Sequence, residues 1–338
     1  MDGLAHGFPL QTIATTQRTL KMAIDCVGVG VHSGRKVSLR LLPAPVDSGI
    51  VFRRTDLPGG PVDIPARFDL VSDTRLCTVL ELPGRPETRV GTVEHLMAAL
   101  MGCGITNVVA ELDGPEVPIL DGSAEPFVFL IGCAGLLDQA AAAPVIEVLR
   151  PVRVAAPDGA FAELRPAPPA AAGLDAAMSI AFDAVAIGRQ ALSLRVTAES
   201  FASELARART FTQLREIEAL RAAGLARGGS LDNAVVVDND RVLNPAGLRM
   251  ADEFVRHKLL DAVGDLGLAG AALHARFVAH RTGHALNNRL LRALFADRAN
   301  WRVVGAGSPQ ADHLPAPGGT TGLPGWRDAH LPVAASPA

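Results

Sequence analysis

The stretch Asp252–Leu266, which reads DEFVRHKLLDAVGDL, decides how the rest of the chain is interpreted. At about 100° per residue, its apolar side chains fall on one side of a helix and its polar ones within the opposite quadrant. Those polar side chains are His257, Lys258, Asp261 and Asp265. A histidine and an aspartate four residues apart share one helical face and can bind a single ion. A solvated polar face would show the same spacing, and spacing alone leaves both interpretations open.

A second helix with a polar pair is expected earlier in the chain. It opens in the segment Thr92–Leu96 with Thr92 as the N-cap, and the glycines at 102 and 104 end it. Glu94 and His95 point away from its apolar side, as a general base beside a metal ligand would. A carboxylate that only stabilises the helix N-terminus is the alternative, and this segment taken alone favours it.

The two helices occupy equivalent places in two halves of similar pattern, residues 16–138 and 146–304. Each half reads as strands, a helix, a strand and a second helix, which indicates a structural duplication only weakly. The expected strands are Thr19–Asp25, Lys36–Leu42, Gly49–Arg53, Cys77–Glu81, Asn107–Leu112, Ile146–Val154, Ala160–Leu164, Met178–Phe182 and Ala275–Ala279. The expected second helices are Ala124–Ile131 and His284–Phe295.

Packing the two halves face to face would bring three metal ligands together. His95 from the first half would then meet His257 and Asp261 from the second. Three protein ligands with a fourth position open are typical of a catalytic zinc site. No H-E-x-x-H motif occurs, so the sequence gives no support to a zincin protease.

The remaining segments are interpreted as a linker, tails and a turn. Residues 139–145, which are rich in alanine, are expected to link the two domains. Residues 1–15 read as an N-terminal tail, and residues 305–338, where Pro, Gly and Ala dominate, as a flexible C-terminal tail. The glycine-rich stretch Gly28–Gly34 lacks the strand–helix context of a dinucleotide fingerprint and reads as a turn.

Composition restricts the class of function and the compartment. The formal net charge is -3 and no basic block occurs, which argues against nucleic-acid binding. Four scattered cysteines without a C-x-x-C pair fit a reducing compartment. Neither a signal peptide nor an apolar stretch long enough to span a bilayer is seen. The sequence therefore predicts a soluble, cytoplasmic protein.

Several segments together carry a family resemblance. The chain resembles the bacterial UDP-3-O-acyl-N-acetylglucosamine deacetylases, which catalyse the committed step of lipid A synthesis. The segments that carry it are Gln17–Leu20, Gly28–Gly34, Arg53–Leu57, Thr92–Leu96, Pro118–Ser123, Ala208–Phe211, Gly228–Ser230, Asp252–Asp265 and Gly283–Asn288. The resemblance implies an α+β fold of two similar α/β layered domains, each with an insert, and an active site at the domain interface.

The resemblance also implies roles for individual residues. One Zn²⁺ per chain is implied, with Fe²⁺ as an alternative for such borderline ligands. Glu94 would be the general base, His284 paired with Asp265 the general acid, and Thr210 the contact to the oxyanion. The helix N-terminus and Asp265 would act on the pKa of His284 in opposite directions, and the sequence leaves open which prevails. The implied metal ligands are His95, His257 and Asp261.

The implied substrate is UDP-3-O-(3-hydroxyacyl)-N-acetylglucosamine, from which hydrolysis would release acetate without need of an oligomer. Lys258, Phe211 and Cys77 would border this substrate. An insert near residues 210–237 would form the passage for the acyl chain, and its apolar residues are Leu214, Ile217 and Leu220. An ordinary amphipathic helix packed on its own core would show the same spacing.

Two other functions remain open on the sequence. The first is a zinc hydrolase or deaminase that acts on another nucleotide sugar or on a nucleoside. The second is a catalytically inactive binding module that retains the fold. Glu94, Asp265 and His284 argue against the second, because a metal scaffold alone would not need them.

Overall fold

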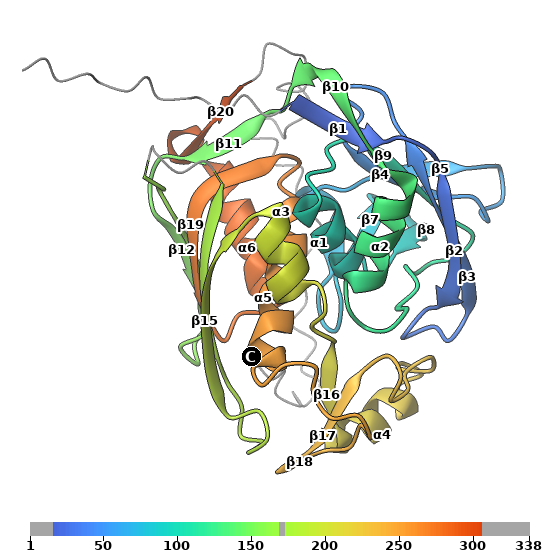
Figure 1. Cartoon of the computed structure of the whole chain (residues 1–338), viewed down its shortest axis with the longest axis vertical. Coiled ribbons are helices and arrows are strands. Elements are labelled where there is room, and N and C mark those ends of the chain that lie inside the picture. Colours follow the sequence, from blue (N-terminus) through green and yellow to red (C-terminus); the bar gives the residue numbers. More distant parts are fainter. Residues whose placement is uncertain (1–15, 169–172, 306–338) are drawn as a thin grey trace, which may run out of the picture.

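In the computed structural model, which describes residues 16–168 and 173–305, two similar domains meet along their helices. The helices of each domain cover one face of its sheet, and the two helical layers lie between the sheets (Figure 1). This confirms the predicted α+β fold of two layered domains. The tail expected at residues 1–15 lies outside the described residues, as does the tail expected at residues 305–338 except for Gly305.

The first domain is built on a five-stranded sheet in the order β2-β3-β9-β4-β5. Only β4 and β9 pair in parallel. Buried and exposed residues alternate along β3, as expected where one face of a sheet is covered. The elements are β2 (Ile24–Val29), β3 (Lys36–Pro43), β4 (Ile50–Arg54), β5 (Val62–Pro65), α1 (Glu94–Gly102), β9 (Val108–Leu112) and α2 (Glu125–Ala134).

A separate three-stranded sheet forms the insert of this domain and follows a short 3-10 helix. Its elements are η1 (Phe68–Leu70), β6 (Val71–Asp73), β7 (Val79–Leu82) and β8 (Arg85–Val90).

The second domain has a seven-stranded sheet in which β19 is central. β13 pairs with β19 antiparallel, while β11 and β14 pair with successive parts of β19 in parallel. The strands are β11 (Val145–Val148), β12 (Val152–Ala155), β13 (Phe161–Arg165), β14 (Leu174–Ala181), β15 (Arg189–Val196), β19 (Ala272–His280) and β20 (Trp301–Val304). The helices are α3 (Ala198–Ser200), the π-helical η2 (Phe201–Leu205), α5 (Glu253–Gly267), α6 (His284–Ala296) and η3 (Arg298–Asn300).

The insert of the second domain is a small sheet with one helix. Its elements are β16 (Phe211–Gln213), α4 (Leu214–Ala222), β17 (Val235–Asp238) and β18 (Arg241–Val242). It lies at one end of the molecule, beside the tip of the β14–β15 hairpin (Figure 1).

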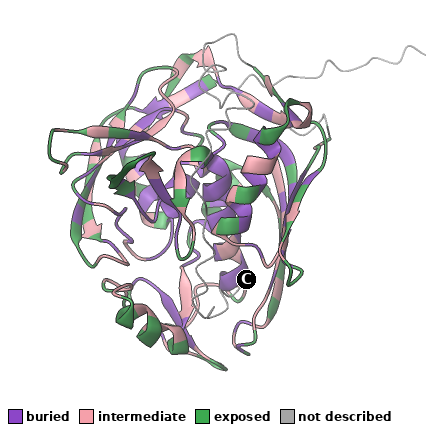
Figure 2. Ribbon diagram, turned by 180° about the vertical axis from the view of Figure 1, so that it is seen from behind, coloured by how far each residue is buried: buried purple, intermediate pink, exposed green. Residues whose placement is uncertain are grey.

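Helices α1 and α5 form the contact between the domains. A Cβ atom at Gly264 would overlap the carbonyl oxygen of Glu94, so only a glycine lets the two backbones approach this closely. Thirteen of the 15 residues of α5 are buried, and the central helices are mostly purple in Figure 2. The alternative of a solvated polar face on α5 is therefore wrong.

The expected linker has regular structure. Leu136–Ala142 forms strand β10, which pairs antiparallel with β1 (Thr16–Leu20). The Gln139 side chain donates a hydrogen bond to the carbonyl of Ala44 and accepts one from Asn107. The linker prediction rests on a segment that lacks both hydrophobic periodicity and bulky side chains, and these tertiary hydrogen bonds order it nonetheless. The domain boundaries themselves stay a prediction.

Three further expectations differ from the structure. The N-cap of α1 is Val93, because Thr92 has a positive φ of 56° and its hydroxyl donates to Glu116 instead. Thr19–Asp25 and Ile146–Val154 are not single strands. Each is divided because its two halves pair with different neighbours: β1 with β10 and β2 with β3, then β11 with β19 and β12 with β13.

Candidate active site

The seam between α1 and α5 brings together the three expected metal ligands. His95 lies in the first turn of α1, and His257 and Asp261 lie one turn apart on α5. The Nε2 atoms of His257 and His95 are 3.2 and 3.5 Å from Oδ1 of Asp261. Ligands about 2.1 Å from a tetrahedral zinc ion are about 3.4 Å from one another. The three side chains therefore have the spacing of a shared ion.

The hydrogen bonds around these residues also fit a metal ion. Oδ1 of Asp261 is buried without a hydrogen-bond donor among the described residues, which is unfavourable unless a cation lies nearby. Nδ1 of His257 is 3.0 Å from the carbonyl oxygen of Ala208. Because a carbonyl only accepts, Nδ1 carries the proton and Nε2 keeps its lone pair for the metal. Nδ1 of His95 has no partner in the described part of the chain.

The charge state of these ligands suits a divalent cation. Burial lowers the pKa of His257 to about 4, so its imidazole is neutral at pH 7. Burial disfavours ionisation of Asp261, but His257 and Lys258 outweigh it and hold the pKa of this carboxyl well below its ordinary value. The ammonium of Lys258 lies 3.3 Å from Oδ2 of Asp261. His257 is therefore a neutral imidazole and Asp261 a carboxylate.

Glu94 lies beside this cluster with one oxygen fixed and the other directed toward a histidine. Oε2 accepts a hydrogen bond of 3.0 Å from the backbone N–H of Thr78. Oε1 is 3.8 Å from Nε2 of His284. Burial raises the pKa of Glu94, which makes its carboxylate a stronger base. The alternative role, as a carboxylate that only stabilises the helix N-terminus, does not explain these contacts.

His284 begins α6 and is paired with Asp265 as expected. Nδ1 of His284 is 2.9 Å from Oδ2 of Asp265, which also accepts a hydrogen bond from Asn287. Burial opposes the charged imidazole, but Asp265 and Glu94 outweigh it and raise the pKa of His284 to about 9. The question that the sequence left open is thus answered in favour of the carboxylates. A histidine protonated at pH 7 can act as an acid.

This arrangement agrees with the comparison to known proteins. The family model of UDP-3-O-acyl N-acetylglycosamine deacetylase matches residues 17–296. The chain belongs to this deacetylase family. A relative from Shewanella frigidimarina named UDP-3-O-acyl-N-acetylglucosamine deacetylase is 49% identical over 290 residues, which are 85% of this chain and 92% of the relative. One of the same name from Idiomarina loihiensis is 48% identical over 295 residues, 87% and 94% of the two chains.

Three further residues expected in the site are Phe211, Thr210 and Cys77. The ring of Phe211 is 6.2 Å from that of His257 and 4.9 Å from that of Phe254. The backbone N–H of Thr210, the residue before β16, donates to the carbonyl of Gly122 and so links the second domain to the first. Cys77 is buried, and burial followed by the charge of Glu94 raises the pKa of its thiol. Its thiol is therefore neutral.

The apolar residues of α4 are only partly covered by the insert. None of the residues of α4 is buried, and Leu214 is 42% exposed. Ile217 and Leu220 are partly buried, so the alternative of an amphipathic helix packed on its own core stays open. Leu214 is exposed, and Ile217 and Leu220 keep part of their surface accessible.

The loop Gly28–Gly34 uses its backbone donors within the protein. The N–H groups of His32 and Ser33 each donate a hydrogen bond of 2.9 Å to the carboxylate of Glu116. A Cβ at Gly30 would overlap that carboxylate, which explains this glycine. The expected turn is confirmed, and its donors are not free for a phosphate.

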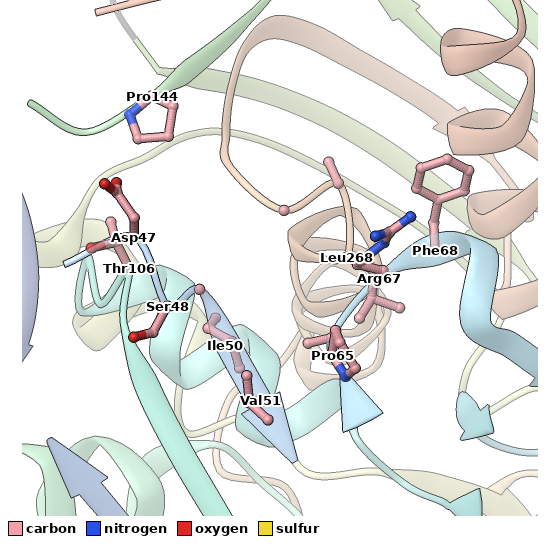
Figure 3. A pocket seen from close by; sticks show the side chains of 14 residues that line it. Asp47, Ser48, Ile50, Val51, Pro65, Arg67, Phe68, Thr106, Pro144 and Leu268 are labelled. Atoms are coloured by element: carbon pink, nitrogen blue, oxygen red, sulfur yellow. The ribbon is translucent and has the colours of Figure 1, made fainter. Parts of the chain in front are cut away.

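A separate cavity of about 180 Å³ lies between the domains at the other end of α5. Asp47 and Thr106 line one side, Arg67 and Phe68 the other, and Pro144 lies at its rim (Figure 3). Leu268–Gly270, which follow α5, also line it. At 1.5 Å per residue, the cavity begins roughly 10 Å along the helix from the metal ligands, so it is not part of the cluster.

Three buried residues of the site were missed by the sequence analysis. Thr78 contacts Glu94 and Asp265, Asn287 contacts Asp265, and Glu253 holds the segment that orients His257. Asn287 and Glu253 lie in segments that carry the resemblance, but no known motif in those segments indicates what either residue does. For Thr78 the signal was its position beside Cys77.

Proposed function

We propose that this chain hydrolyses the N-acetyl group of UDP-3-O-acyl-N-acetylglucosamine, releasing acetate and a free amine, with one divalent ion held by His95, His257 and Asp261. The observation that carries the proposal is the convergence of these ligands with Glu94 and His284 in one buried site. Family membership and the names of its relatives support the reaction and the substrate. They disfavour a deaminase, and the intact acid and base disfavour an inactive binding module.

The proposed ion is zinc, and Fe²⁺ is the alternative for this ligand set. When bound, the ion supplies a Lewis acid that polarises an acyl oxygen and acidifies water. His257 binds through Nε2 because the carbonyl of Ala208 holds the proton on Nδ1. Asp261 provides the negative charge that retains a divalent cation.

Glu94 acts as the general base in this proposal. Its buried carboxylate removes a proton from the attacking water while Thr78 keeps the second oxygen in place. The hydroxyl of Thr210 is assigned to the developing oxyanion, as in the family resemblance.

His284 acts as the general acid. It transfers the proton on Nε2 to the departing nitrogen, because an unprotonated amide nitrogen is a poor leaving group. Asp265 retains the proton on Nδ1 and stabilises the imidazolium. The short separation of 3.8 Å between His284 and Glu94 lets the two groups serve the same amide.

The substrate contacts are assigned on both sides of the metal ligands. Lys258, Phe211 and Cys77 border the substrate, and the partly exposed apolar side chains of α4 line the acyl passage. A long acyl chain gains affinity where it covers apolar surface of this kind. We place the reaction in the cytoplasm and require only a single chain. No helix among the described residues is long and apolar enough to cross a membrane.

Metal analysis combined with an acetate-release assay tests this function. The purified protein should contain one zinc per chain and release acetate from the 3-O-acylated UDP sugar in preference to UDP-N-acetylglucosamine. Equal rates on both substrates would favour a different nucleotide-sugar hydrolase. Absence of both bound metal and acetate would contradict the proposal.

A further inference from the structure

Thr78 contacts Glu94, the proposed base, and Asp265, the residue paired with the proposed acid His284. It lies immediately before β7, in the insert of the first domain, and is 1% exposed. Its backbone N–H donates to Oε2 of Glu94 over 3.0 Å, and its hydroxyl donates to Oδ1 of Asp265 over 2.6 Å. Its carbonyl accepts the N–H of Val93, the residue before α1. All its polar groups are therefore used in the site.

The contact with Glu94 fixes which carboxylate oxygen is free. Because the N–H of Thr78 holds Oε2, Oε1 is the oxygen that faces Nε2 of His284. This hydrogen bond comes from the backbone and does not depend on the side chain at position 78. It also links α1 to the segment that leads into β7.

The contact with Asp265 joins the insert to the other domain. Asp265 lies on α5, where Oδ2 receives His284 and Asn287 and Oδ1 receives the hydroxyl of Thr78. Donors on both oxygens prevent the carboxylate from rotating, so the imidazole bonded to it keeps one orientation. Without the hydroxyl, Oδ1 would lose the donor that the structure gives it.

We propose that Thr78 is a positioning residue, which holds Glu94 and the Asp265–His284 pair at a fixed separation for proton transfer. This inference rests on the deacetylase function proposed above. It gives the small β6–β8 sheet a part in the reaction, because that sheet presents Thr78 to both domains. Thr78 itself transfers no proton.

Two substitutions at position 78 separate positioning from packing. Thr78→Val keeps the branched shape and the backbone N–H but removes the hydroxyl. Thr78→Ser keeps the hydroxyl and removes a methyl group. The matched control is Thr88→Val in the same insert sheet, since Thr88 is also buried and its hydroxyl donates to the carbonyl of Arg85.

The experiment measures kcat, KM, bound zinc and Tm for the three variants. Loss of a group that orients an active-site carboxylate typically lowers activity about 10–100-fold, so kcat of Thr78→Val should fall by this factor. Its KM and zinc content should stay at the wild-type values, and Thr78→Ser should keep most of the wild-type kcat. Thr88→Val should lower Tm and leave kcat unchanged.

A wild-type kcat for Thr78→Val, or an equal loss in Thr78→Ser, would overturn the inference. If Thr78→Val does not fold, Thr78→Cys replaces it, because a thiol is a weak donor. Its kcat should fall well below that of Thr78→Ser, and a kcat equal to that of Thr78→Ser would contradict the inference. Absence of acetate release by the wild-type protein would contradict the proposed function instead.

Discussion

The seam between α1 and α5 and the insert that carries α4 differ in how far their side chains are buried. At the seam, His95, Asp261 and Asp265 are less than 5% exposed, and both carboxylate oxygens of Asp265 accept hydrogen bonds. On α4 no residue is buried, and Leu214 keeps 42% of its surface accessible. The seam fixes the groups to which we assign the chemistry, whereas the insert leaves apolar surface partly exposed, where we place the acyl chain. Substitutions in the two regions should therefore change different measured quantities.

The largest expected effect is at a metal ligand of the seam. His257→Ala should lose both bound zinc and acetate release, because two ligands hold the ion too weakly. Metal analysis and the acetate assay on the purified variant check this. The matched control is His274→Ala on β19, since His274 is also buried but lies outside the cluster. Zinc loss in the control as well would mean that the effect is one of folding.

A smaller effect is expected at the base. Glu94→Gln should keep stoichiometric zinc and lower kcat by about 10²–10⁴-fold, the usual range for loss of a general base. The amide keeps the shape of the side chain but cannot accept the proton. Hydrolysis at the wild-type rate would show that another group removes the proton from water.

The pH dependence of kcat/KM tests the assignment of His284 as the general acid. The pKa of His284 is raised to about 9, so its acidic form is present below this pH and is lost above it. We expect kcat/KM to decline with an apparent pKa near 9, and His284→Ala to lack this decline along with most of the activity. A profile of the wild type that stays flat to pH 10 would contradict the assignment of His284 as the acid.

The smallest effect is expected on the insert. Ile217→Ala should raise KM for a long-acyl substrate several-fold, because about 0.8 kcal/mol is lost for each methylene that the acyl chain no longer covers. KM for the unacylated UDP sugar, kcat and zinc content should not change. Glu218→Ala, an exposed residue on the same helix, is the control. An equal change of KM for both substrates would contradict the assignment of α4 to the acyl passage.

The two regions also differ in how far the sequence predicted them. The spacing of His257 and Asp261 predicted that both side chains share one helical face, because the period of a helix is known, but left open whether that face binds a metal. The convergence of His95 with them followed from the repeated order of elements. The deacetylase family was named from the segments that carry the resemblance, and the comparison confirms it.

Tertiary contacts account for what the sequence did not predict. Thr78 and Asp265 are 187 positions apart, and no local pattern relates them. The segment of β10 has neither hydrophobic periodicity nor bulky side chains, so the sequence predicts a linker, while its pairing with β1 depends on a segment about 120 residues away. The wrong N-cap at Thr92 has a similar cause, because its hydroxyl is used by Glu116.

A crystal structure with anomalous diffraction data at the zinc edge tests the central claim most directly. A single peak about 2.0–2.2 Å from Nε2 of His95, Nε2 of His257 and a carboxylate oxygen of Asp261 is predicted. An active enzyme whose metal peak lies elsewhere, or which shows no peak at this seam, would contradict it.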